Sequence, residues 1–197
     1  DVKSNMNLGL VYLALGKIDQ AVTYLERATR LDPQNASAWS NLGVALDARG
    51  STVLAESTYR KALELDSSNV VTLQNLAQNL ISQDKAPEAV NIMEQVLSRQ
   101  DTPATRKRYA DALARGKKYD DAMTQYDLAL KADPKYLPAL NEKAATYIRK
   151  YVDGLELDDS LRVSALDLWK KSLAMNPNQP RVIESLKKWE KSSLFSN

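Results

Sequence analysis

Two stretches of the chain carry the same pattern: residues 8–33 read LGLVYLALGKIDQAVTYLERATRLDP, and residues 42–67 read LGVALDARGSTVLAESTYRKALELDS. They are offset by 34 residues, so that Leu8 aligns with Leu42. A fixed period of this length is typical of a repeat protein, in which each copy is one supersecondary unit. The pattern recurs along the chain at three kinds of position: Ala21, Ala55, Ala89 and Ala122; Ala28, Ala62, Val96 and Ala129; Leu25, Tyr59, Met93, Tyr126 and Trp169.

Each copy contains two helical segments joined by a turn. Apolar residues in 8–15 fall at i, i+3, i+4 and i+7, which predicts an amphipathic helix. Gly16, Gly50 and Gly116 lie midway through their copies, where a tight turn between helices favours a positive φ. The sequence therefore predicts a series of helix-turn-helix units.

These residues together resemble the signature of the tetratricopeptide repeat (TPR) family over residues 2–178. The resemblance implies an all-α fold, a right-handed α-solenoid of five helix-turn-helix units and a C-terminal capping helix. Residues 1–197 are thus expected to form a single TPR array. Its expected parts are units 2–35, 36–69, 70–102, 103–136 and 137–178, followed by a capping helix at 179–193.

The fifth copy departs from the pattern in two ways. About nine extra residues fall near 151–159, and they include Asp153, Glu156, Asp158 and Asp159. Their spacing does not match a calcium-binding loop, so we expect no metal there. A solvated extension of helix and loop is expected, with an added contact surface as the alternative. Lys143 stands where the other copies carry Leu or Tyr, and the sequence does not say how it packs.

Composition restricts the chemistry that the chain could perform. The 197 residues include no His and no Cys, which excludes imidazole or thiol nucleophiles, Cys/His zinc sites and disulfides. We find no carboxylate pair or tuned Lys arranged for acid–base work and expect no catalytic residue and no cofactor. The formal net charge is +2, too small for a general polyanion binder. Without an apolar run long enough to span a membrane, we expect a soluble protein, and cytoplasm and periplasm both stay open.

Candidate binding residues follow from the family resemblance. In TPR stacks the first helix of each unit lines a concave groove. We therefore expect a peptide-binding groove at the equivalent positions of this sequence, which include Asn7, Asn41, Asn75, Gln74, Gln78, Lys107, Arg108, Asp111, Arg115 and Asn141.

Asn7, Asn41 and Asn75 occupy one equivalent position, 34 residues apart. This column resembles the asparagine ladder of the O-GlcNAc-transferase superhelix. Because an amide both donates and accepts, such a column could hold the backbone of an extended peptide. The alternative is that each Asn bonds locally to a neighbouring helix.

A second family mode is the carboxylate clamp of chaperone adaptors. Asn75 and Arg108 match two of its five positions, whereas Ser40, Val44 and Ala104 depart from it. Lys107 and Arg108 could still bind an acidic side chain or a terminal carboxylate. Six basic residues lie within 106–118, but we expect a solvated helix face there and no specific nucleic-acid binding.

The sequence thus predicts a non-catalytic protein–protein interaction scaffold that binds an extended peptide or partner segment. The alternative is a substrate-docking or regulatory portion of a larger enzyme or assembly complex. Self-association through the first copy stays open, because Met6, Leu10 and Leu13 would be uncovered if no repeat preceded them.

Overall fold

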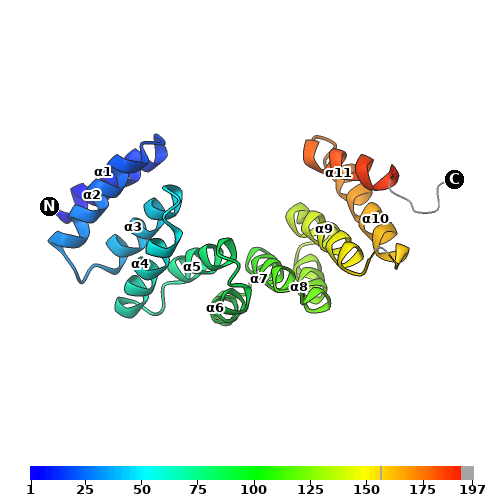
Figure 1. Ribbon diagram of the computed structural model, residues 1–197, viewed down its shortest axis with the longest axis horizontal. Helices are drawn as coiled ribbons and strands as arrows, with labels where there is room; N and C mark the ends of the chain where they lie inside the picture. The colour runs from blue at the N-terminus through cyan, green and yellow to red at the C-terminus, as the bar shows by residue number, and fades with distance from the viewer. Residues whose placement is uncertain (156, 192–197) are drawn as a thin grey trace. The chain divides into compact units, whose positions relative to one another are not determined.

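The computed structural model describes residues 1–155 and 157–191. Within these ranges the chain forms eleven α-helices and no strand (Figure 1). Their bounds are α1 Val2–Ala14, α2 Ile18–Leu31, α3 Ala36–Ala48, α4 Thr52–Leu65, α5 Val70–Ser82, α6 Ala86–Arg99, α7 Pro103–Arg115, α8 Tyr119–Ala132, α9 Leu137–Asp153, α10 Asp159–Met175 and α11 Pro180–Lys191.

The helices fall into two compact units. Unit 1, Asp1–Arg99, stacks three helix pairs, α1/α2, α3/α4 and α5/α6. Unit 2, from Gln100 onwards, stacks the pairs α7/α8 and α9/α10, and α11 packs on α10. Along the chain there are thus five helix pairs and a final helix in the described residues, which confirms the predicted all-α fold.

Side-chain caps begin several of the first helices. The backbone N–H of Ala38 donates to Asn35 Oδ1 at 3.0 Å, and the N–H of Thr72 donates to Asn69 Oδ1 at 3.0 Å. Thr102 plays the same part for α7, where its hydroxyl accepts from the N–H of Thr105 at 3.1 Å. Each cap satisfies a backbone donor that has no partner within its own helix, so helix starts are fixed locally.

The turn within each pair uses one left-handed residue, and its identity varies. Gly16 and Gly50 have φ of +69° and +84°, as the sequence predicted. Asp84 and Lys117 have φ of +60° at the same place in later copies. The expectation for Gly116 was wrong, because Gly116 has φ of −77° and the residue after it adopts the left-handed conformation. A Lys therefore takes a backbone conformation that glycine adopts more readily.

Small residues let the two helices of a pair approach closely. A Cβ atom on Gly43 would lie 2.5 Å from the Tyr59 ring, and one on Gly9 would lie 2.5 Å from Leu25 Cγ. Tyr59 and Leu25 are fully buried at these contacts. The small and large residues of the repeat pattern thus pack against each other where α1 contacts α2 and where α3 contacts α4.

A buried polar network joins the second and third helix pairs. Asn79, 2% exposed, donates from Nδ2 to Asp47 Oδ1 at 2.5 Å and to the carbonyl of Thr52 at 2.9 Å. The Tyr59 hydroxyl donates to the other oxygen of Asp47 at 2.9 Å, and Gln83 donates to Asn79 Oδ1 at 2.7 Å. Burial raises the pKa of Asp47, while the bonds from Asn79 and Tyr59 oppose that rise. This network fixes α5 against α3 and α4 by specific polar contacts.

The fifth pair is longer than the others. Both α9 and α10 have 17 residues, whereas α1, α3, α5 and α7 have 13 each. The buried Lys143 on α9 forms an ion pair with Asp127 on α8, and its ammonium lies 5.8 Å from the centre of the Tyr147 ring. The end of the expected capping helix, 192–193, lies outside the described residues, as does Glu156.

A second polar network in unit 1 is centred on Glu56 of α4. Its carboxylate, in a side chain only 13% exposed, accepts from Lys85 at 2.6 Å, from Arg60 at 2.8 Å and from Gln83 at 3.0 Å. The contact with Lys85, followed by those with Arg60 and Gln83, lowers the pKa of Glu56 from 4.5 to about 2. Glu56 therefore stabilises the fold as an anion.

We expect Glu56→Gln to lower the free energy of unfolding by about 1–2 kcal/mol at pH 7, allowing for screening of its half-exposed partners. Because the pKa of the folded state is depressed, this stabilisation is complete above pH 4.5 and is lost as the pH falls towards 2. Denaturant unfolding at pH 7 and at pH 2.5 measures it: the difference in stability between the variant and wild type should be much smaller at the second pH than at the first. Glu64→Gln is the control, because Glu64 is 65% exposed and its pairing with Lys61 contributes little. A gap that stays constant with pH would contradict the assignment.

Candidate functional site

The asparagine column of Asn7, Asn41 and Asn75 lies on α1, α3 and α5 of unit 1. Asn7 is exposed, and the other two are half-buried. None of the three side chains forms a hydrogen bond or other polar contact with any of the described residues 1–155 and 157–191. The local hydrogen bonds considered as the alternative are therefore not made there, and each amide keeps its donors and acceptor for another molecule.

The other predicted residues of unit 1 lie beside this column on α5. Gln78 is exposed, and Gln74 is half-buried and takes part in a polar contact of its own. The hydroxyl of Ser40, on the equivalent turn of α3, accepts from Thr72 at 2.8 Å and is occupied by that bond. The free polar groups of this face are thus chiefly carboxamides, which suit a peptide backbone better than a charged ligand.

In unit 2 the predicted residues are mostly charged, and several are bound to one another. Lys107 forms an ion pair with Asp111 at 2.7 Å, and the buried Tyr126 donates its hydroxyl to Asp111 at 2.7 Å. Burial raises the pKa of Asp111, and Lys107 and Tyr126 counteract the rise. Asp111 therefore has a packing role, like that of Asp47 in unit 1. Arg108 is exposed and has a polar contact within the chain.

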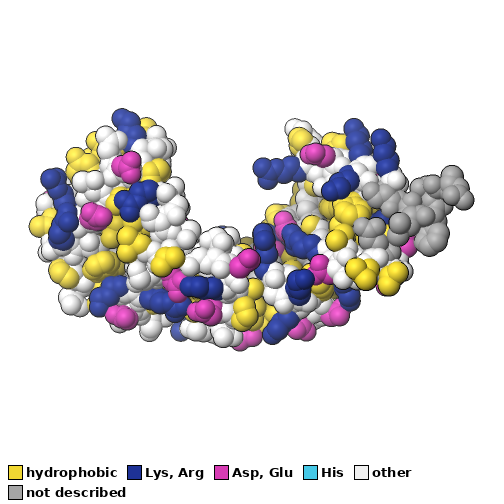
Figure 2. All heavy atoms as spheres, in the orientation of Figure 1, with side chains coloured by type: hydrophobic (Ala, Val, Ile, Leu, Met, Phe, Trp, Pro, Cys, Tyr) yellow, Lys and Arg dark blue, Asp and Glu magenta, His cyan; other side chains and the backbone are white. Residues whose placement is uncertain are grey.

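Arg115 and Asn141 differ in how far the fold engages them. Arg115 is exposed and has no hydrogen-bond or ion-pair partner in the described part of the chain. Asn141 donates from Nδ2 to Gln179 at 2.8 Å, just before α11, while its Oδ1 is buried without a partner there. Figure 2 shows Lys and Arg interspersed with Asp and Glu over α7–α9. Unit 2 therefore offers charge where unit 1 offers amides.

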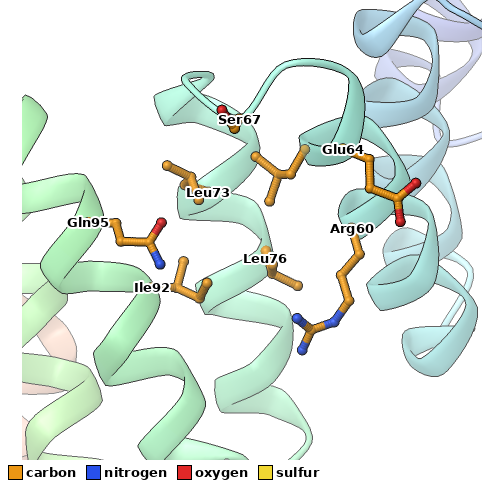
Figure 3. A pocket seen from close by; sticks show the side chains of 8 residues that line it. Arg60, Glu64, Ser67, Leu73, Leu76, Ile92 and Gln95 are labelled. Atoms are coloured by element: carbon orange, nitrogen blue, oxygen red, sulfur yellow. The ribbon is translucent and has the colours of Figure 1, made fainter.

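A hollow of about 380 Å³ in unit 1 was missed by the sequence prediction. Leu73 and Leu76 of α5 face into it between Ile92 of α6 and Arg60 of α4 (Figure 3). The repeat pattern marks Leu76 as a core residue, and it is 1% exposed, so nothing in the sequence signals an opening beside it. Polar side chains share its lining with these apolar residues, namely Arg60, Glu64, Ser67 and Gln95.

Three acidic residues of the fifth-copy insert, Asp153, Asp158 and Asp159, have structural contacts. Asp158 caps α10 by accepting from the N–H of Ser160 at 3.1 Å, and Asp159 binds Arg162 at 2.6 Å and 3.0 Å. Asp153 contacts Tyr119 and Lys117. Within 1–155 and 157–191 no group of three or more His, Cys, Asp or Glu is placed to hold a metal ion. Nor does any helix in those ranges have the length and apolar character to cross a membrane.

Comparison with known proteins places this geometry in a family. The model of the tetratricopeptide repeat matches residues 6–70 and 75–136. Superkiller complex protein 3 of Homo sapiens is 26% identical over 157 residues, which are 76% of this chain and 8% of that protein. The type IV pilus assembly protein PilF of Pseudomonas aeruginosa is 38% identical over 84 residues, 43% of this chain and 33% of PilF. The chain therefore spans a third or less of these relatives' length.

The fold is also similar to solved structures. The crystal structure of YrrB, described as a TPR protein with an unusual peptide-binding site, has a TM-score of 0.72 and 19% sequence identity. The similarity covers 95% of this chain and 92% of YrrB. At this identity the likeness establishes the helical architecture alone.

Proposed function

Since this chain belongs to the tetratricopeptide repeat family, we propose that it is a protein-interaction scaffold that holds an extended peptide segment along the first helices of unit 1. TPR proteins mediate protein–protein interactions, and the proposal adds the mode of binding. Its main support is the unoccupied asparagine column, whose amides can pair with a peptide backbone in both directions. The proposal assigns binding rather than catalysis to these residues.

The arrangement suits a ligand that is recognised by backbone more than by sequence. Amides one repeat apart could each bond a successive part of an extended chain, and each bond adds about 0.5–1.5 kcal/mol net. Useful affinity then needs several repeats acting together on one ligand. The half-buried Val44 and Ile81 beside the column could contact alternate side chains of that ligand.

We expect the variant Asn41→Ala/Asn75→Ala to lose about 1–3 kcal/mol of binding free energy for peptides captured by the wild type, because two backbone bonds are removed. Capture from a peptide array, followed by titration of the hits, measures this loss. Thermal unfolding should be nearly unchanged, because neither amide bonds within the described residues.

The matched control is Gln20→Ala/Asn91→Ala, which removes two exposed carboxamides from the second helices α2 and α6. This control should bind as the wild type does. If the column variant and the control retain equal affinity, the ligand does not use the column, and the proposed mode is wrong.

A further inference from the structure

The extra length of α9 brings its last turn against the preceding helix pair. Lys150 forms an ion pair with Asp120 at the start of α8. At the last residue of α9, Asp153 Oδ2 accepts from the Tyr119 hydroxyl at 2.6 Å and lies 2.9 Å from Lys117 Nζ. The part of the insert that extends α9 therefore contacts the turn between α7 and α8 and the start of α8 through these polar bonds, and lies beside that turn.

The extended end of α9 and this turn border an open hollow of about 320 Å³ within unit 2. Ala114, Ile148 and Val152 give it an apolar side. Arg115, Lys117 and Arg149 line the rest, together with Tyr119 and Asp153. A helix of 13 residues in place of α9 would end before Val152 and Asp153, so the hollow depends on the extension.

Positive charge in the hollow exceeds the negative charge. Arg115 is exposed and has no partner in the described residues, whereas Arg149 forms a 3.5 Å ion pair with Glu142 and a 3.3 Å hydrogen bond to Thr146. The Tyr119 hydroxyl and then Lys117 hold the pKa of Asp153 below its usual value, so this carboxylate is ionised and already engaged. Arg115, Lys117 and Arg149 thus outnumber the one carboxylate that lines the hollow, Asp153, which is itself paired with Lys117.

We propose that this hollow binds a carboxylate of a partner protein, with an aliphatic side chain next to that carboxylate packed on Ile148 and Val152. The guanidinium groups of Arg115 and Arg149 present planar pairs of N–H donors that match a carboxylate. The apolar side of the hollow favours a peptide over an inorganic anion. An aliphatic side chain of a peptide can cover this apolar surface and gain free energy by doing so, whereas an inorganic anion has no apolar group to cover it. The carboxylate belongs either to an Asp or Glu side chain or to a C-terminus.

This inference rests on the proposed function in one respect, since it takes the ligand to be a peptide, but it uses unit 2 and none of the asparagine column. It gives the insert a role that the repeat pattern alone does not supply. Lys117 lines the hollow from the left-handed backbone position that Gly16, Gly50 and Asp84 occupy in the earlier turns.

The test uses the whole chain and a library of fluorescent octapeptides in three arms. The first arm carries one Glu between Leu residues and an amidated C-terminus; the second carries Gln there and a free C-terminal carboxylate; the third carries Gln and an amide. We expect one of the first two arms to bind more tightly than the third, and the arm that binds identifies the source of the carboxylate. Equal binding of the three arms, or no binding, would overturn the proposal.

Two variants with opposite expected effects on affinity make the test specific. Arg115→Gln/Arg149→Gln should weaken the preferred arm about tenfold or more, as expected for the loss of charge-assisted hydrogen bonds. Asp153→Asn should strengthen it several-fold, because it removes the negative charge and frees Lys117 while an oxygen remains for Tyr119. Weaker binding in both variants would overturn the electrostatic account.

Controls separate this proposal from the function proposed for unit 1. Lys171→Gln/Lys187→Gln removes two exposed charges from α10 and α11 and should leave affinity unchanged. Asn41→Ala/Asn75→Ala should still bind the acidic octapeptide, even if the asparagine column proves to bind nothing. A loss of affinity in the lysine control equal to that in the arginine variant would show that net charge alone acts, and the hollow would not be the site.

Discussion

Replacing Trp169 by Ala is expected to destabilise unit 2 by about 3–5 kcal/mol, because it leaves a large cavity in a core that can collapse only partly. Trp169 is 4% exposed and packs in a cluster with Ala144, Ile148, Leu166 and Val182. That cluster joins α9, α10 and α11, so the substitution should loosen the final helix as well as the fifth pair. Denaturant unfolding gives the total loss.

The position of the loss is as diagnostic as its size. Amide hydrogen exchange should speed up in α9–α11 and change little in α1–α4, which belong to the other compact unit. Val163→Ala is the control on the same helix, because Val163 is 44% exposed and its loss should cost less than about 0.5 kcal/mol. A loss under about 1 kcal/mol for Trp169→Ala would mean that this cluster does not hold the end of the stack together.

The second large effect is expected for Asn79→Ala, at about 2–4 kcal/mol. Ala45 and Ala112 stand at the equivalent positions of the second and fourth copies and are fully buried, so alanine fits the space. The loss comes instead from the partners left behind, since the partly buried Asp47 and Thr52 carbonyl each lose a hydrogen-bond donor. Thermal and denaturant unfolding of unit 1 measure it.

The pH dependence and a double variant test the cause. Without Asn79 the pKa of Asp47 rises further, and a raised carboxyl pKa means that stability is greatest below the unfolded value of 3.8 and is lost as the pH rises. The deficit of Asn79→Ala should therefore shrink as the pH falls. Asp47→Ala/Asn79→Ala should lose less than the sum of the two single changes. Strict additivity would show that the two side chains act independently.

The architecture could be predicted because its determinants are local and repeated. The aligned Gly43 and Tyr59, or Gly9 and Leu25, are small and large residues one helix apart, and the structure shows them in direct contact. The longer fifth pair was visible as an insert of acidic residues near 151–159. Repetition multiplies such weak signals until they identify a fold.

Polar contacts between copies could not be predicted, because the repeat pattern describes a single copy. Asn79 replaces an apolar or small residue, and only the neighbouring Asp47 explains it. Lys143 likewise depends on Asp127, and Asn141 depends on Gln179, which is 38 residues away. The left-handed conformation was expected at Gly116 and occurs at Lys117, because the turn position repeats along the chain whereas the glycine does not.

In the candidate site, too, repeated positions could be predicted from the sequence, whereas contacts between neighbouring side chains could not. The column of Asn7, Asn41 and Asn75 could be predicted because it repeats, and the structure adds that these amides have no partners in the described residues. Lys107 and Asp111 looked equally suited to a ligand, yet they bind each other. A single sequence gives the position of a side chain on a helix but not whether a neighbour has already engaged it.

The hydrogen bonds between successive pairs span about one repeat of sequence. The bonds from Thr72 to Ser40 and from Asn79 to Asp47 each join residues 32 apart, and the bond from Asn141 to Gln179 joins residues 38 apart. A chain whose contacts are this local loses little entropy in closing each loop and should fold quickly. Within each unit a pair can dock as soon as it and its predecessor exist, so each unit can grow in step with synthesis on the ribosome.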